Sequence, residues 1–402
     1  MIHCKRFQHF DARRVPSPCF VVDEVAVENN LKILQRVQQE SGANVLLALK
    51  AFSMFSLAPL VMRYLSGTCA SGLHEARLGA EYFRGADGAG QIHTYSAAYN
   101  EADLGEILKI SDHVVFNSFA QWQRFQPLIQ AAVAERPQLK FGLRINPQHS
   151  EGTTPIYDPC APGSRLGIPR AAFEGQSLVG ISGLHFHTLC EQGFDALERT
   201  LAAVEEKFGG FLPQLEWVNF GGGHLISHPD YDVDGLIAAI RCFQQKYKVQ
   251  VYLEPGEAIA IRSGVLVSEV LDVLDYGQSA GGKLAILDSS ATCHMPDTLE
   301  MPYQAQVFGA TTVQRGQTEG NHCYRLGGMS CLAGDVMGDY CFEQPLEVGQ
   351  RLIFDDMAHY TMVKTTTFNG VRLPAIAIWN STTDAINVVR EFGYDDFKMR
   401  LS

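Results

Sequence analysis

A lysine ends the strongest apolar run in the first part of the chain. The run reads VLLALKAFS over residues 45–53, and Lys50 follows five apolar residues. Lysine is rarely buried without a partner. The stretch alone favours a strand whose last side chain extends its ammonium group to water. The chemical alternative is an amine held in a pocket to react with a carbonyl group.

Two more features follow apolar runs in the same way. Gly221, Gly222 and Gly223 follow LEWVNF, and Glu254 follows VQVYL and precedes Pro-Gly. A tight turn and a solvated strand end would explain both features without any function. Glycines also let backbone N–H groups approach phosphate oxygens closely. A carboxylate such as Glu254 could keep a pyridine nitrogen protonated, as pyridoxal phosphate requires when it withdraws electrons.

The stretch GLHFH contains two histidines, His185 and His187. Histidines two apart on a strand share a face, and this spacing also occurs among metal ligands. A metal-dependent hydrolase is therefore the alternative from a different class, but it needs more ligands than the single acid at Glu254. One imidazole stacked on a planar cofactor needs only His187, which is nearest the strand end. We therefore expect no metal, and His185 as a hydrogen-bonded supporting residue.

Short apolar strands alternate with amphipathic helical stretches from about residue 26 to 262. Such alternation indicates parallel pairing with right-handed crossovers, and eight units predict a closed (β/α)₈ barrel, in which the site lies at the carboxyl ends of the strands. An open doubly wound sheet is the competing architecture. The eight predicted strands cover residues 44–50, 67–71, 91–96, 113–118, 140–146, 179–187, 215–223 and 249–256.

The remainder of the chain has a different pattern. Residues 263–402 contain strands joined by turns, with no long helical pattern until the end, and predict a β-sandwich or β-barrel domain. Residues 1–25 are expected to join this domain before the chain enters the barrel at residue 26. The chain is thus predicted to form two domains, as its 402 residues also indicate.

Composition narrows the possible partners. The chain has 46% hydrophobic residues and a net charge of −12, from 32 basic and 44 acidic residues. This charge argues against nucleic acid or an anionic membrane as a partner and is compatible with a cationic small molecule. No apolar run is long enough to span a membrane, and the first residues lack an apolar signal core, so a cytoplasmic protein is expected. Ten cysteines without a Cys-x-x-Cys pair predict reduced thiols.

Six ordered motifs resemble those of one enzyme group. The strand-1 lysine, HFH, GGG, EPG, SC…D and DMAHYT…TTFNG are similar to the fold-type III pyridoxal phosphate decarboxylases, which include ornithine, arginine and diaminopimelate decarboxylases. The resemblance covers nearly the whole chain. Within the group, LALKAFS, GLHFHTLCE, SRLGI and LEPGEA are most similar to the branch that decarboxylates carboxynorspermidine and carboxyspermidine in polyamine biosynthesis. Decarboxylation of diaminopimelate or ornithine is the runner-up.

The resemblance implies a role for each matching residue. Lys50 would form the Schiff base with pyridoxal 5'-phosphate, His187 would stack on its ring, and Glu254 would hold its nitrogen. Cys331 would reach the site of the neighbouring subunit in a homodimer and protonate the decarboxylated carbon. The other residues implied to bind the cofactor are Gly221, Gly222, Gly223, Tyr360, Arg144 and Glu75.

The chain departs from the ornithine-type pattern at three places. Leu189-Cys190 stands where those enzymes have Gly-Ser, and Glu257 stands where they have arginine. The acid that adjoins the family's cysteine is here four residues further on, as Asp335. A carboxypolyamine carries at least one distal cation, and the acidic candidates for binding it are Asp335, Glu191 and Glu257.

Overall fold

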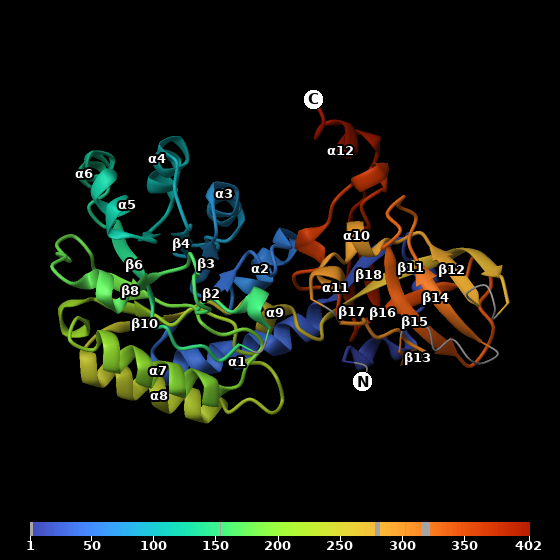
Figure 1. Ribbon diagram of the computed structural model, residues 1–402, viewed down its shortest axis with the longest axis horizontal. Helices are drawn as coiled ribbons and strands as arrows, with labels where there is room; N and C mark the ends of the chain where they lie inside the picture. Colours follow the sequence, from blue (N-terminus) through green and yellow to red (C-terminus); the bar gives the residue numbers. More distant parts are fainter. Residues whose placement is uncertain (1–2, 153, 278–281, 302, 315–321) are drawn as a thin grey trace. The chain divides into compact units, whose positions relative to one another are not determined.

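A ring of eight parallel strands forms the first part of the structure (Figure 1). The computed structural model describes residues 3–152, 154–277, 282–301, 303–314 and 322–402. The ring closes because β10 pairs with β2 and β5 pairs with β6. The predicted (β/α)₈ barrel is therefore confirmed. Its strands are β2 (Asn44–Ala48), β3 (Gly67–Ala70), β4 (Gln91–Tyr95), β5 (His113–Phe116), β6 (Lys140–Asn146), β8 (Gly183–His185), β9 (Trp217–Asn219) and β10 (Gln250–Leu253), and the two-residue β7 (Ile168–Pro169) extends β6.

Amphipathic helices cross between these strands. In α7 (Phe194–Phe208), buried side chains recur every three or four residues, from Ala196 to Phe208, so one face packs inward. It lies beside α8 (Val233–Tyr247), whose first turn is capped by the Asp232 side chain (Figure 1). The other helices of this part are α1 (Glu24–Ser41), α2 (Ala58–Val61), α3 (Leu73–Tyr82), α4 (Glu101–Ile110), α5 (Phe119–Arg124), α6 (Gln126–Glu135) and α9 (Glu257–Ala260).

Large rings fill the interior of the barrel. Trp217 packs with Tyr252, and its indole covers Gly183, where a Cβ atom would lie 2.0 Å from the ring. His93 and His113 stack with ring centroids 3.9 Å apart. Burial is the main cause that lowers the pKa of His93 well below its usual value and that of His113 to about 3. Both rings are therefore neutral and act as packing residues at neutral pH.

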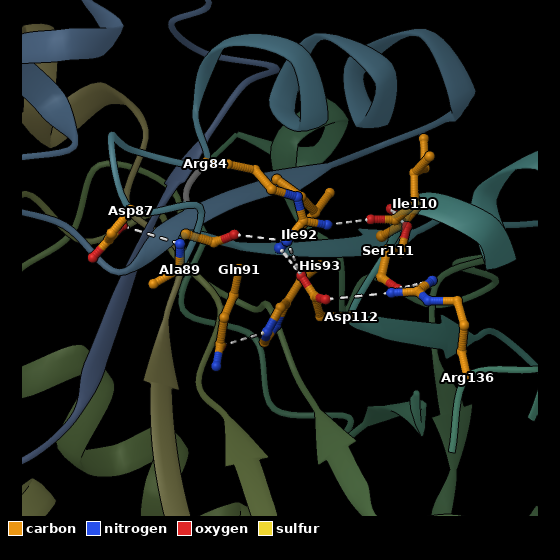
Figure 2. A network of polar contacts seen from close by, with 12 residues as sticks. Arg84, Asp87, Ala89, Gln91, Ile92, His93, Ile110, Ser111, Asp112 and Arg136 are labelled. Atoms are coloured by element: carbon orange, nitrogen blue, oxygen red, sulfur yellow. Dashed lines mark hydrogen bonds and ion pairs between the residues drawn. The ribbon is translucent and has the colours of Figure 1, made fainter. Parts of the chain in front are cut away.

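A polar network closes the barrel where β4 and β5 begin (Figure 2). Asp112 accepts hydrogen bonds from the backbone N–H of Ile92 at 2.8 Å and from Arg84 at 3.0 Å, and Arg136 lies 3.5 Å away. Arg84 and Arg136 also donate to backbone carbonyls around residues 108–111. This end of a barrel supports stability, whereas the opposite end carries function.

The other part of the chain is a mixed β-sheet. Its strand order is β13-β15-β14-β12-β11-β1-β17-β18, with β16 paired to β11. The first strand lies between two strands from the second half of the chain, antiparallel to β11 and parallel to β17. The strands are β1 (Cys19–Asp23), β11 (Gly264–Asp275), β12 (Lys283–Leu287), β13 (Ala310–Val313), β14 (Cys323–Gly327), β15 (Val336–Phe342), β16 (Arg351–Phe354), β17 (Ala375–Asn380) and β18 (Ala385–Arg390). Three short helices accompany them, α10 (Ala291–His294), α11 (Asp297–Glu300) and α12 (Tyr394–Lys398).

The N-terminal residues contribute to the core of this sheet. Phe7 and Phe10 pack against Trp379 of β17, with ring centroids 4.8 and 5.1 Å apart. By compactness the chain divides into Glu28–Ile259 and a second unit made of Met1–Val27 and Ala260–Ser402. The long-range pairing of β1 explains why both chain termini belong to one unit.

One cysteine pair differs from the sequence-based expectation. Cys323 and Cys341 form a disulfide, whereas reduced thiols were expected throughout. The register of β14 and β15 places the two residues directly opposite each other, which the sequence separation of 18 residues does not reveal. In the part of the chain that the structure describes, no helix has the length and apolarity needed to cross a membrane.

Candidate active site

Functional groups gather at the carboxyl ends of the barrel strands. Lys50 lies two residues beyond β2, His187 two residues beyond β8, and Glu254 directly beyond β10. The glycine turn Gly221–Gly223 follows β9, and Arg144 lies near the end of β6. The closed ring of strands therefore brings these residues to one rim, where barrel enzymes place their sites.

Lys50 lies beside a histidine. Its Nζ atom is 3.4 Å from Nε2 of His187. Solvent reaches the side chain, yet protein groups surround its ammonium, and this desolvation, followed by the charge of Arg144, lowers the pKa of Lys50. A lowered pKa increases the fraction of neutral amine, which is the form that attacks a carbonyl group.

His187 is held as a neutral imidazole. Its Nδ1 atom accepts a hydrogen bond from the backbone N–H of Gly222 at 2.9 Å. Burial, followed by the charges of Lys50 and Arg144, lowers the pKa of His187 well below its usual value. Arg144 donates to the backbone carbonyl of His187 at 3.0 Å and lies over the ring of Tyr95 at 4.7 Å. The ring is thus fixed in position and uncharged, and a flat ring held in this way can stack on a planar cofactor.

Two residues grip the Glu254 carboxylate. Asn219 donates from Nδ2 to Oε1 at 2.6 Å, and Nε2 of His185 lies 3.4 Å from Oε2. Burial by itself would raise the pKa of Glu254, but His185, Asn219 and Lys50 together hold it below its usual value. The carboxylate is therefore ionised, as a partner for a protonated ring nitrogen must be.

Sequence reasoning did not single out Asn219. Its Oδ1 atom accepts the backbone N–H of Gly221 at 2.8 Å, while its Nδ2 atom donates to Glu254. One amide therefore connects the carboxylate to the glycine turn, and the two contacts determine which way the amide points. A polar residue that ends a buried strand directly before the glycine run was the available signal.

The glycine turn fits a phosphate group. Gly221 and Gly223 have φ values of 70° and 87°, and a Cβ atom on Gly223 would lie 1.8 Å from the carbonyl oxygen of Leu189. His224 follows directly, buried, with Nδ1 2.6 Å from the Tyr231 hydroxyl. Its Nε2 atom has no hydrogen-bond partner among the described residues. Close backbone packing and an unpartnered buried nitrogen suit an anion at this place.

Three acidic residues that the sequence placed in the site lie near the rim, namely Glu75, Glu191 and Glu257. Glu75, in the first turn of α3, accepts the backbone N–H of Ser71 at 2.6 Å and so holds the end of β3. Glu191 and Glu257 both act on Cys190, whose pKa rises to about 11 through burial and then through these two charges. The Cys190 thiol is therefore neutral, and two carboxylates lie close to it.

The remaining candidates belong to the sheet unit. Cys331 is exposed on the loop between β14 and β15, and its backbone N–H donates to Oδ1 of Asn369 at 2.8 Å. Asp335 is buried, and its carboxylate accepts hydrogen bonds from Ser290, Thr292 and Ser330. Tyr360 is half-buried and has a φ value of 48°.

The two histidines of GLHFH do not form part of a cluster of metal ligands among the described residues. The described residues include no group of three or more His, Cys, Asp and Glu side chains that could hold a metal ion. His185 and His187 instead face different partners, Glu254 and the Gly222 amide.

Comparison with known proteins shows the family. The family model described as pyridoxal-dependent decarboxylase, C-terminal sheet domain, matches residues 19–358. The chain therefore belongs to the pyridoxal-dependent decarboxylases, and the resemblance predicted from its motifs is confirmed.

Two relatives of the chain are decarboxylases named for their substrates. The chain is 46% identical over 388 residues to carboxyaminopropylagmatine decarboxylase of Synechocystis sp., with 96% of each chain covered. It is 42% identical over 394 residues to carboxynorspermidine/carboxyspermidine decarboxylase of Campylobacter jejuni, covering 96% of this chain and 99% of the relative. The protein is thus a decarboxylase, a carboxy-lyase.

Solved structures agree with the fold. Carboxynorspermidine decarboxylase of Campylobacter jejuni, complexed with norspermidine, superposes with a TM-score of 0.85 at 42% identity, covering 96% of this chain and 100% of that one. Diaminopimelate decarboxylase of Helicobacter pylori, complexed with L-lysine, gives a TM-score of 0.76 at 17% identity, with 97% of each chain covered. At that identity, the second likeness shows the fold alone.

Proposed function

We propose that this protein uses pyridoxal 5'-phosphate to decarboxylate carboxynorspermidine, carboxyspermidine or both. The observation that carries the proposal is the arrangement of Lys50, His187 and Glu254 on one rim of the barrel. Relatives named for these substrates, at 42% and 37% identity, support it. The diaminopimelate and arginine decarboxylases are only 17% identical to the chain, so such substrates are not favoured.

The cofactor would be held by the rim. Lys50 would bind it covalently, His187 would cover its ring face, and Glu254 would pair with the ring nitrogen. When bound, the cofactor supplies a sink for the electron pair that carbon dioxide leaves behind. The residues proposed for the phosphate are the glycine turn Gly221–Gly223 and Tyr360, whereas Arg144 and Glu75 support the rim through their backbone contacts.

Cys331 would complete the reaction. Carbon dioxide leaves with its oxygens, and the carbon left behind takes one proton from the Cys331 thiol, which then recovers a proton from water. Cys331 is exposed, and so are Met329 and Leu332 on the same loop. Phe368 is exposed as well, and it directly precedes Asn369, which accepts the Cys331 N–H. We propose that a second copy of the chain covers this surface in a homodimer, in which each subunit contributes Cys331 to its partner's site.

The distal cation of the substrate needs an acidic partner. Glu191 and Glu257 are the candidates for this partner in the barrel unit, and both lie close to Cys190. The carboxylate of Asp335 is already occupied by three hydrogen bonds within the sheet unit, so we propose a different role for it below.

Carboxyaminopropylagmatine represents a second class of substrate that should be assayed. The relative with 46% identity is named for carboxyaminopropylagmatine, which ends in a guanidinium group. Both classes share a carboxylated aminopropyl end, and the reacting groups of the rim would contact only that end. The difference would lie at the distal cation, where a guanidinium needs a planar pair of acceptors.

One experiment tests the proposal. Carbon dioxide release is measured with carboxynorspermidine, carboxyspermidine, carboxyaminopropylagmatine, ornithine and diaminopimelate, and the visible spectrum of the purified protein is recorded. We expect release from the carboxypolyamines and a cofactor absorption band that Lys50→Ala abolishes together with turnover. Release from ornithine or diaminopimelate alone, or normal turnover by Lys50→Ala, would contradict the proposal.

A further inference from the structure

We propose that Asp335 and Asn369 are positioning residues that hold two consecutive peptide units, Met329–Ser330 and Ser330–Cys331, and so aim the Cys331 thiol. The inference rests on the proposed function, in which this thiol donates the proton. It assigns Asp335 to the orientation of the proton donor instead of to the substrate, and it adds Asn369 to the residues that support the reaction.

Asp335 is the first of the two side chains that anchor the loop between β14 and β15. It is 4% exposed, and its Oδ2 atom accepts the backbone N–H of Ser330 at 3.0 Å and the hydroxyl of Ser290 at 2.8 Å. Its Oδ1 atom accepts the backbone N–H of Thr292 at 3.2 Å. Ionised acceptors make the stronger hydrogen bonds, so the buried carboxylate ties Ser330 to the start of α10.

Asn369 anchors the next peptide unit. Its Oδ1 atom accepts the N–H of Cys331 at 2.8 Å from a separate turn, Phe368–Gly370. Asn369 has a φ value of 57°, a conformation that asparagine and glycine adopt more readily than other residues. Two consecutive backbone N–H groups are thus held by two side chains from different segments.

The loop is also closed upon itself. The backbone N–H of Gly328 donates to the carbonyl of Asp335 at 2.9 Å, and that of Asp335 donates to the carbonyl of Leu332 at 3.0 Å. A Cβ atom on Gly328 would lie 2.5 Å from the Asp335 carboxylate, so only glycine lets the loop lie this close.

These contacts hold the backbone of Ser330 and Cys331 in place, while the Cys331 side chain remains exposed. Cys331 is exposed while its own N–H and that of Ser330 are both bound. Rotation about the side-chain bonds is then the main freedom left to the thiol. A proton donor held in this way delivers its proton to one carbon instead of several, because proximity and orientation decide the rate.

Matched variants separate the hydrogen bond from backbone strain. Asn369→Gly removes the acceptor and tolerates the positive φ, whereas Asn369→Asp keeps an acceptor oxygen. Asn100→Gly is the control, because the Asn100 side chain also accepts a backbone N–H, from Asp103 at 2.8 Å, at the start of α4 in the barrel unit. Asp335→Asn, which loses the charge, tests the second anchor.

Two readouts are taken on the holoenzyme. Amide hydrogen exchange over residues 329–333 should become about tenfold faster in Asn369→Gly, the loss expected for one hydrogen bond, and stay near the wild-type rate in Asn369→Asp and Asn100→Gly. The fraction of turnovers that end in transamination instead of decarboxylation should rise about tenfold in Asn369→Gly. Asp335→Asn should shift both readouts in the same direction.

The two readouts distinguish the possible failures. We call the hydrogen bond that holds the loop backbone to Asn369 the tether. An unchanged rate of amide hydrogen exchange in Asn369→Gly would show that this tether does not hold the loop. Faster exchange with an unchanged product ratio would overturn its role in aiming the thiol. Cys331→Ala is measured alongside, and if it still decarboxylates without transamination, the proton-donor assignment in the proposed function fails, whereas the exchange rates judge the tether independently.

Discussion

The backbone N–H of Gly222 donates a hydrogen bond to Nδ1 of His187 over 2.9 Å. A neutral imidazole that accepts at Nδ1 carries its proton at Nε2, and that atom lies 3.4 Å from Nζ of Lys50. The glycine turn therefore sets the tautomer of the ring beside the lysine. The position of the glycine turn and the placement of the proton near Lys50 are therefore linked through one side chain.

Substitutions of His187 separate its flat ring from its hydrogen bond. His187→Phe keeps a ring for stacking but accepts nothing from Gly222, and His187→Ala loses both. We expect the dissociation constant of pyridoxal phosphate to rise about tenfold in the phenylalanine variant and further in the alanine variant. Absorbance titration measures it, with His9→Phe, in the sheet unit, as control. Equal affinities for both variants would mean that stacking contributes nothing.

Asn219 can be tested by a change that keeps one of its two contacts. Asn219→Asp retains an acceptor for the Gly221 N–H but replaces the donor to Glu254 with a like charge, which raises the pKa of Glu254. We expect kcat to fall at least tenfold and the acidic limb of its pH profile to move to higher pH. Asn219→Ala, which loses the donor without adding a charge, should lower kcat and move that limb in the same direction but less far. If Asn219→Asp had the pH profile of the wild type, the Asn219 side chain would not control the pKa of Glu254.

Buried histidines make the barrel sensitive to acid. The pKa of His113 is about 3 in the folded protein, mainly through burial, and about 6.5 when unfolded. The unfolded chain thus binds the proton first, so stability is complete above pH 6.5 and is lost as the pH falls toward 3. This residue alone should cost about 2 kcal/mol of unfolding free energy at pH 5.

His113→Phe tests this acid sensitivity. The variant keeps a ring against His93 but takes up no proton. Its melting temperature should fall less between pH 7.5 and pH 5 than that of the wild type. Parallel pH dependences for the two proteins would assign the acid sensitivity to other groups.

The network around Asp112 should affect stability without affecting chemistry (Figure 2). Asp112→Ala removes the side-chain acceptor of the Ile92 N–H and the carboxylate partner of two arginines, which should lower the free energy of unfolding by about 2–3 kcal/mol. Urea unfolding measures the loss. At a temperature where the variant is folded, kcat should be unchanged, because the network lies at the opposite end of the strands from Lys50. A large fall in kcat would contradict this separation.

The barrel was readily predictable because its signals are local. Each strand is a short apolar run, and each crossover is an amphipathic segment such as Phe194–Phe208. The positions of Lys50, His187 and Glu254 at one rim followed from the architecture, since all parallel strands of a barrel end on one side. The roles of these residues in catalysis stay predictions.

The contacts between distant segments were not predictable in this way. Asn219 reads as one more polar residue, and Asp335 reads as an acid available for a cation, until the structure shows that each is already bound. The pairing of Cys323 with Cys341 depends on strand register, which no local pattern reveals.

By itself, then, the sequence determined the alternation of strands and helices, the number of barrel units and the residue types at the rim, because these depend on apolar periodicity and chain order. Only the tertiary structure decided which partners those residues have. Hydrogen bonds such as Gly222 to His187 and Cys331 to Asn369 join segments 35 and 38 residues apart, and their formation depends on how the whole chain packs.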